Sequence, residues 1–170
     1  IEALLRFLGD DPDREGLRDT PKRYIKFLQE FLNPPSFNLT TFTNEGGHDM
    51  VVQTDIPFYS ICEHHLAPFF GTATVAYLPK QRIVGLSKLA RTVQHFGCRL
   101  QNQERITKQV ADLLESALEP EGVAVVLKAR HLCMEMRGVK AHPAQTTTSR
   151  MVGGFFDNAS ARSEFFEMVR

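Results

Sequence analysis

The fold of this chain is decided by residues 50–77, which read MVVQTDIPFYSICEHHLAPFFGTATVAY. From Met50 to Phe58 the residues alternate with a period of two, which is typical of a β-strand with two different faces. Residues 69–77 predict a second strand, which Pro79 closes. We therefore expect an antiparallel hairpin that carries the sequence Cys-Glu-His-His in its turn.

The turn of this hairpin has the side chains of a zinc site. Cysteine thiolate and neutral imidazole are the ligands that zinc prefers, and the C-x-x-H spacing lets one turn direct Cys62 and His65 at a single ion. Neighbouring histidines usually point in different directions, so we expect His64 to be released for substrate. Cys133 is the obvious third ligand, and three protein ligands keep a position open for water, as in catalytic zinc sites. The alternative is a closed structural site in which His131 or His64 fills the fourth position.

The rest of the chain predicts further helices and strands. Apolar spacing, together with glycine and proline breaks, places helices at residues 1–8, 20–33, 85–96, 101–118 and 161–169, and strands at 123–129 and 146–149. This order indicates an α+β fold with two helices on one face of an antiparallel sheet. We divide the chain into an N-terminal helical arm and linker, residues 1–49, and a main domain, residues 50–170.

Two of these helices carry specific local expectations. The second begins near Thr20, and its side chains at helical spacing predict one buried face. Those side chains are Tyr24, Phe27, Leu28 and Phe31. In the third helix, which opens at residues 85–88, Ser87 is the expected N-cap.

Composition excludes several classes of protein. A chain of 170 residues fits one domain with a short N-terminal addition. Its 20 basic and 20 acidic residues balance, which argues against a general attraction to nucleic acid or to an anionic membrane. No apolar run approaches the roughly 20 residues of a membrane span. Three cysteines without a signal peptide favour a reduced, cytoplasmic protein over a disulfide framework.

His131 is a candidate acid or base. If the chain around it stays extended, residues i and i+2 point to the same side, so His131 would lie beside Cys133 and face the metal. The ordinary pKa of histidine lies near neutrality, which suits proton transfer. The alternative is that His131 ligates zinc or only packs.

Two helix starts carry candidate binding residues. Ser87, Lys88 and Arg91 lie in the first turns of one helix, where free N–H groups and the helix dipole favour an anion. Glu104, beside Gln103, could accept two hydrogen bonds from a guanine edge, although first-turn glutamates are also common dipole partners. Taken singly, Arg137 and Arg23 indicate surface charges.

Four ordered blocks together resemble the signature sequences of the zinc-dependent GTP cyclohydrolase I family. They are CEHH at 62–65, GLSKLAR at 85–91, QNQER at 101–105 and HLCMEMRG at 131–138. The resemblance runs from about Gly16 through the terminal helix. It implies hydrolysis of GTP at C8 by a zinc-activated water, which gives 7,8-dihydroneopterin triphosphate and formate as the first step towards folate or tetrahydropterin cofactors.

The resemblance also implies roles for individual residues. The zinc ligands would be Cys62, His65 and Cys133, and the catalytic residues His64, His131 and Ser87. Glu104 and Gln103 would hold guanine. The triphosphate would contact Ser87, Lys88, Arg91 and Arg137, with Arg23 contributed across a subunit boundary.

The family fold is the tunnelling fold, in which the sheets of several subunits join into a barrel. It implies a homodecamer of two stacked pentamers with sites between subunits, and it leaves room for allosteric control by a regulatory protein. One departure is that Asn102 stands where an apolar residue is common in the family.

Two other hypotheses stand beside this one. The first is a tunnelling-fold pterin or deazapurine enzyme that recognises a purine-like ring through Glu104 without hydrolysing GTP. The second is a zinc-stabilised oligomeric binding module, which would hold its zinc with four protein ligands.

Overall fold

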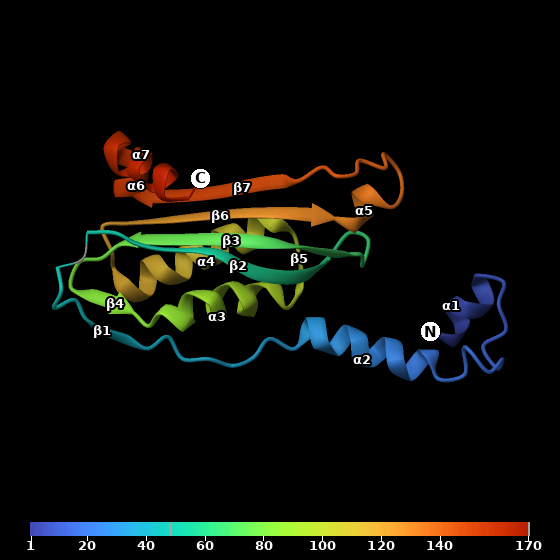
Figure 1. Ribbon diagram of the computed structural model, residues 1–170. Helices are drawn as coiled ribbons and strands as arrows, with labels where there is room; N and C mark the ends of the chain where they lie inside the picture. The colour runs from blue at the N-terminus through green and yellow to red at the C-terminus, as the bar shows by residue number, and fades with distance from the viewer. Residues whose placement is uncertain (48, 170) are drawn as a thin grey trace.

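The structure is a computed structural model that describes residues 1–47 and 49–169. Its centre is a curled sheet whose described strands follow the order β5-β2-β3-β6-β7 (Figure 1). These strands are β5 (Leu100–Gln101), β2 (Val51–Cys62), β3 (Pro68–Leu78), β6 (Gly122–His131) and β7 (Thr146–Gly153). A separate pair joins β1 (Thr41–Thr43) to β4 (Arg82–Val84).

The predicted hairpin is confirmed. β2 and β3 pair antiparallel, and the buried side chains of Ile56 and Phe58 alternate with exposed neighbours as the period of two indicated. The register shifts between Gln53 and Ile56, where Asp55 takes a left-handed φ of 54°. This is the geometry of a β-bulge, which bends the strand locally.

The prediction of a wholly antiparallel sheet is wrong at one edge. β5 pairs with β2 in parallel, with Cys62 opposite Gln101, so the sheet is mixed. The strands β1, β4 and β5 were not predicted, because runs of two or three residues have no measurable period. β1 lies inside the stretch that was expected to be a plain linker.

Two helices back one face of the sheet, as predicted. They are α3 (Leu86–Gly97) and α4 (Gln103–Leu118), and both lie on the same side of the strands in Figure 1. Their inward side chains are fully buried in the main core, among them Leu89, Val93, Ile106, Val110 and Leu114. Ala111 is also fully buried, whereas Ala117 is exposed.

The opposite face of the sheet is partly covered by the C-terminal helices α6 (Gly154–Asp157) and α7 (Ala159–Met168). Ala124 and Val126 of β6 form a second cluster with Phe155 and Phe165, whereas Val125 belongs to the main core. Adjacent residues of a strand point to opposite faces, so the two clusters lie on the two sides of one sheet.

The N-terminal arm consists of α1 (Glu2–Phe7) and α2 (Thr20–Leu32) and extends beyond the end of the sheet (Figure 1). The buried face predicted for α2 is wrong for the single chain: within the described residues, none of this helix is buried. Phe27 contacts Tyr24 and Phe31 but remains 40% exposed.

The caps of α3 and α4 differ from expectation. The N-cap of α3 is Gly85, which has no side chain for capping, and Ser87 is an exposed residue inside the helix. α4 begins later than predicted, because Gln101 belongs to β5. Its N-cap is Asn102, whose Oδ1 accepts a hydrogen bond from the Arg105 N–H at 2.8 Å. Asn102 therefore has a structural use as the cap of this helix.

Among the residues that the structure describes, no helix combines the length and the apolar character that crossing a bilayer requires.

Candidate active site

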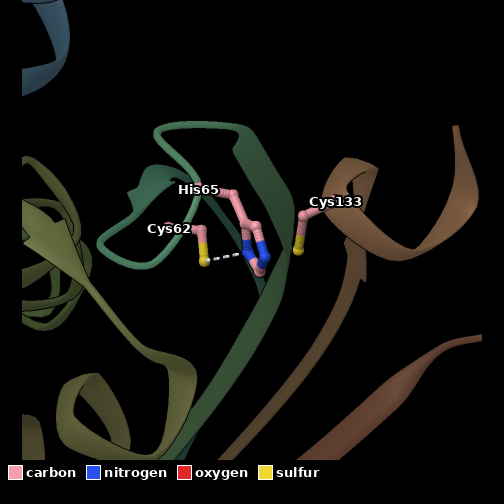
Figure 2. A group of neighbouring side chains, drawn as sticks. All are labelled: Cys62, His65 and Cys133. Atoms are coloured by element: carbon pink, nitrogen blue, oxygen red, sulfur yellow. Dashed lines mark hydrogen bonds between the residues drawn. The ribbon is translucent and has the colours of Figure 1, made fainter. Parts of the chain in front are cut away.

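Three side chains from separate segments meet at one end of the sheet. Cys62 is the last residue of β2, His65 lies in the following turn, and Cys133 lies in the short helix α5 (Leu132–Glu135). Their ligand atoms are all within 4.8 Å of one another, and Figure 2 shows the His65 ring between the two sulfur atoms. The predicted ligand residues are therefore brought together.

The donor set and its spacing fit a tetrahedral zinc ion. Zn–S and Zn–N bonds of about 2.3 and 2.0 Å place neighbouring ligand atoms about 3.5–3.8 Å apart. Cys62 Sγ and His65 Nδ1 are already 3.9 Å apart. An ion would have to draw the farthest pair at most about 1 Å closer, which side-chain rotation can supply.

The surroundings of the Cys133 thiol disfavour its ionised form. Burial raises the pKa of the Cys133 thiol, and the neighbouring Cys62 raises it further, while Arg137 lowers it only weakly. A divalent cation beside the sulfur atom would instead favour the thiolate. Binding of a metal ion at this cluster would therefore release the thiol proton of Cys133.

His131 does not lie beside Cys133 in the way that an extended chain would give. β6 ends at His131, and the next residues turn into α5, so the i, i+2 argument is wrong. The His131 ring instead stacks on Phe69, with 4.7 Å between ring centroids and 5° between planes. Within the described residues, the ligand cluster includes neither His131 nor His64, which favours a site with an open position.

Gln103 determines which nitrogen of His131 carries a proton. The Gln103 amide nitrogen donates to the carbonyl oxygens of Leu127 and Thr146, both at 3.0 Å. Its Oε1 therefore faces His131 and is 2.8 Å from Nε2 of that ring. Because an amide oxygen can only accept, Nε2 of His131 must be the donor, and Nδ1 is the nitrogen left for other partners.

The environment of His131 also alters its acidity. Burial lowers the pKa of His131, and the nearby carboxylates of Glu104 and Glu135 partly oppose this effect. Glu104 itself is exposed at the first turn of α4. By contrast, the Gln103 side chain is 1% exposed and its polar atoms are all engaged, so any contact of Gln103 with guanine would have to come from its backbone.

His64 is exposed on the metal turn. Its Nδ1 is 3.9 Å from Cys62 Sγ, and its Nε2 is 3.8 Å from Oε1 of Glu63. The side chain is 65% exposed, so it has freedom to meet a substrate.

The residues expected to bind phosphate are spread over three segments. Ser87, Lys88 and Arg91 lie in the first turns of α3, with Ser87 and Arg91 exposed and Lys88 half-buried. Arg137 follows α5 and is exposed. Arg23 belongs to the arm helix α2 and forms a 3.3 Å ion pair with Asp19 of the same segment.

Sequence reasoning missed two carboxylates that hold the metal-bearing segments. Arg130 donates two hydrogen bonds to the carboxylate of Glu135, at 2.7 and 2.6 Å, and these connect α5 to the end of β6. Glu63 receives a similar bond from Arg105 of α4. Glu63 stands between two expected ligands in the sequence, and that position was the available signal.

Comparisons with known proteins agree with these features. The family described as GTP cyclohydrolase I matches residues 1–170. A protein named GTP cyclohydrolase 1 from Sulfurihydrogenibium sp. is 50% identical over 170 residues, which cover 99% of this chain and 91% of that protein. A protein of the same name from Aquifex aeolicus is 48% identical over 171 residues, which cover 100% of this chain and 93% of that protein.

Among solved structures, the chain resembles the archaeosine synthase QueF-Like in the apo form. The TM-score is 0.53 at 15% identity, and the match covers 63% of this chain and 96% of the other. This likeness concerns the fold.

Proposed function

Because the chain belongs to the GTP cyclohydrolase I family, we propose that its active site is built on a zinc ion held by Cys62, His65 and Cys133. Like its family, the chain is an enzyme that converts GTP to 7,8-dihydroneopterin triphosphate and formate, the first step of pterin biosynthesis. The observation that carries the proposed site is the convergence of two thiols and one imidazole from β2, its turn and α5.

Zinc rather than another ion is supported by the donor set, because two thiolates and an imidazole are the ligands it prefers. When bound by three protein ligands, zinc lowers the pKa of a coordinated water to about 7 and so makes a hydrolytic nucleophile available at neutral pH.

We assign the first proton transfer to His131, which in its doubly protonated form would give its Nδ1 proton to N7 of guanine while C8 is attacked. Its support is geometric: Phe69 and Gln103 hold the ring from two sides, so its orientation is set before substrate arrives. His64 and Ser87 would serve the later proton transfers, in which the ribose opens and rearranges. Both are exposed, which suits contact with a substrate.

We propose that Glu104 accepts hydrogen bonds from the guanine edge, beside Gln103. Its carboxylate is exposed at the start of α4, where a substrate can reach it. The triphosphate would lie at the N-terminus of α3, where Ser87, Lys88 and Arg91 add to the free N–H groups of the helix. Arg137 and Arg23 would complete the anion site, Arg23 from a neighbouring subunit.

Assembly into a homodecamer of two stacked pentamers is also part of the proposal, with the sheets joined into a barrel. Within the described residues, none of the apolar side chains of α2 is fully buried, and the outer edge of β7 pairs with no strand. Both features are typical of surfaces that another copy covers. The division into an arm, residues 1–49, and a domain, residues 50–170, fits this arrangement.

Replacing Phe27 by glutamate is expected to weaken the assembly without unfolding the subunit. Phe27 is 40% exposed in the single chain, so a charge there costs little until a second copy covers it. Light scattering after size-exclusion chromatography should give the mass of ten chains for the native protein and a smaller mass for the variant. Glu30→Gln, also exposed on α2, is the control and should leave the mass unchanged. Equal masses for Phe27→Glu and the native protein would contradict this assignment of α2.

We also propose a cytoplasmic enzyme, since all three cysteines are free and the zinc site requires reduced thiols. A regulatory protein partner and allosteric control remain part of the hypothesis, for which the exposed arm offers a surface.

The assay that tests the function is direct. Zinc-loaded protein is incubated with GTP, and formate is measured together with the near-ultraviolet absorbance of a dihydropterin. Both products are expected to appear in equal amounts. Absence of formate from folded, zinc-loaded protein would contradict the assignment.

A further inference from the structure

Glu63 joins the metal-binding turn to the start of α4. Its Oε2 accepts from Nη1 of Arg105 at 2.6 Å, and its Oε1 accepts from Nη2 of Arg105 at 2.9 Å. Oε1 also accepts from Nδ2 of Asn102 at 3.1 Å. We call these three residues the clasp.

The clasp lies between the two halves of the proposed site. Glu63 is flanked in the chain by the ligand Cys62 and by His64, while Asn102 and Arg105 flank Gln103 and Glu104. A displacement between the two sides of the clasp would therefore move the metal ligands relative to the guanine-binding residues.

The partners of Glu63 are themselves fixed. The Oδ1 of Asn102 caps α4, so its amide group can turn only Nδ2 towards Glu63. Nη1 of Arg105 also donates to Oε1 of Gln101 at 3.3 Å, and Gln101 is 1% exposed. The backbone N–H of Glu63 donates to the carbonyl of Gln101 at 3.0 Å, which continues the parallel pairing of β2 with β5. Main chain and side chains thus hold the turn in the same register.

Glu63 also faces a proposed catalytic group. Its Oε1 is 3.8 Å from Nε2 of His64. With Arg105 holding this carboxylate, the His64 ring has a fixed negative neighbour. The clasp therefore acts on both the ligands and the exposed histidine of the turn.

The exposure of the clasp argues against a role in overall stability. The side chains of Glu63 and Arg105 are 28% and 42% exposed, and ion pairs at such sites contribute little to the free energy of folding. The effect on the site is expected to be larger than the effect on folding. Loss of a partner that orients metal ligands typically lowers metal affinity or activity about 10- to 100-fold.

We propose that the clasp of Glu63, Asn102 and Arg105 is a positioning device for GTP hydrolysis, which sets the metal-bearing turn against Gln103 and Glu104. This inference rests on the zinc ligands and guanine site of the proposed function. Asn102 gives the chain a second donor to this carboxylate, beside Arg105.

The test compares Glu63→Gln, Arg105→Gln and the double variant. Each single variant is expected to raise the zinc dissociation constant and to lower kcat at saturating zinc, both about tenfold. The KM for GTP should change less than about threefold, because the phosphate-binding residues of α3 are untouched. The double variant should lose no more zinc affinity or kcat than either single variant, because the same interaction is broken in all three. Zinc affinity is measured without GTP, by competition with a chromophoric chelator.

Asp112→Asn is the matched control. It removes the carboxylate of the Lys108–Asp112 ion pair on the same helix α4, and zinc affinity and kcat should stay at native values. If the zinc affinity and kcat of Glu63→Gln and Arg105→Gln also stayed at native values, the proposed role of the clasp would be wrong. It would also be wrong if a fall in melting temperature accounted for the whole loss of kcat. If Cys133→Ala instead kept its zinc, the ligand assignment itself would fail, which separates the two hypotheses.

Discussion

Cys133→Ala is expected to lose zinc, and with it nearly all GTP hydrolysis. The variant leaves Cys62 and His65, and two ligands from one turn do not hold a zinc ion in a protein site. From the total affinity of zinc sites, one lost ligand should raise the zinc dissociation constant about 100- to 1000-fold. Metal content after dialysis and formate release with GTP measure the two effects.

Cys98→Ala is the control for this experiment. Cys98 is a free, half-buried thiol at the end of α3, outside the ligand cluster, so its removal should leave zinc content and turnover unchanged. Retention of stoichiometric zinc by Cys133→Ala would show that the ion is held elsewhere.

His131→Ala is expected to keep zinc but to lose turnover. The ligand cluster does not include His131, whereas removal of a general acid typically costs 10²–10⁴-fold in rate, so kcat should fall by about that factor. Zinc content should match the native protein, and the KM for GTP should change little. Steady-state kinetics and metal analysis on the same preparation separate the two quantities.

Two further variants sharpen the result. His131→Ala leaves the buried Oε1 of Gln103 without a donor, so His131→Asn, which offers an amide N–H, tests whether the loss comes from chemistry or from local structure. His142→Ala removes an exposed histidine and should behave as the native protein. If His131→Ala released zinc as readily as Cys133→Ala, the assignment of an open site would be wrong.

Much of the hairpin and the pair of metal ligands in its turn could be predicted, because their signals are local. The period of two in β2 depends on adjacent residues, and the types of Cys62 and His65 already match zinc within one turn. The α3 and α4 helices were found for the same reason, although their caps were not.

The remaining features depend on partners distant in sequence. Gln103 is oriented by the carbonyls of Leu127 and Thr146, which belong to two later strands, so nothing in its own segment indicates that it faces His131. α5 bends the chain where an extended segment was expected, and the Arg130 bond to Glu135 holds that bend. Whether the apolar face of α2 is buried depends on what packs against it, which the sequence of the helix does not show.

The distance in sequence between the metal ligands has a thermodynamic consequence. β3, α3, α4 and β6 lie between His65 and Cys133, so the complete ligand set exists only when the sheet has formed. An ion that binds only the native state stabilises that state against unfolding, by about 2.7 kcal/mol at a free ion concentration of 100 times Kd. Zinc would thus act on the whole unfolding transition, and the melting temperature of the protein should rise with the logarithm of free zinc.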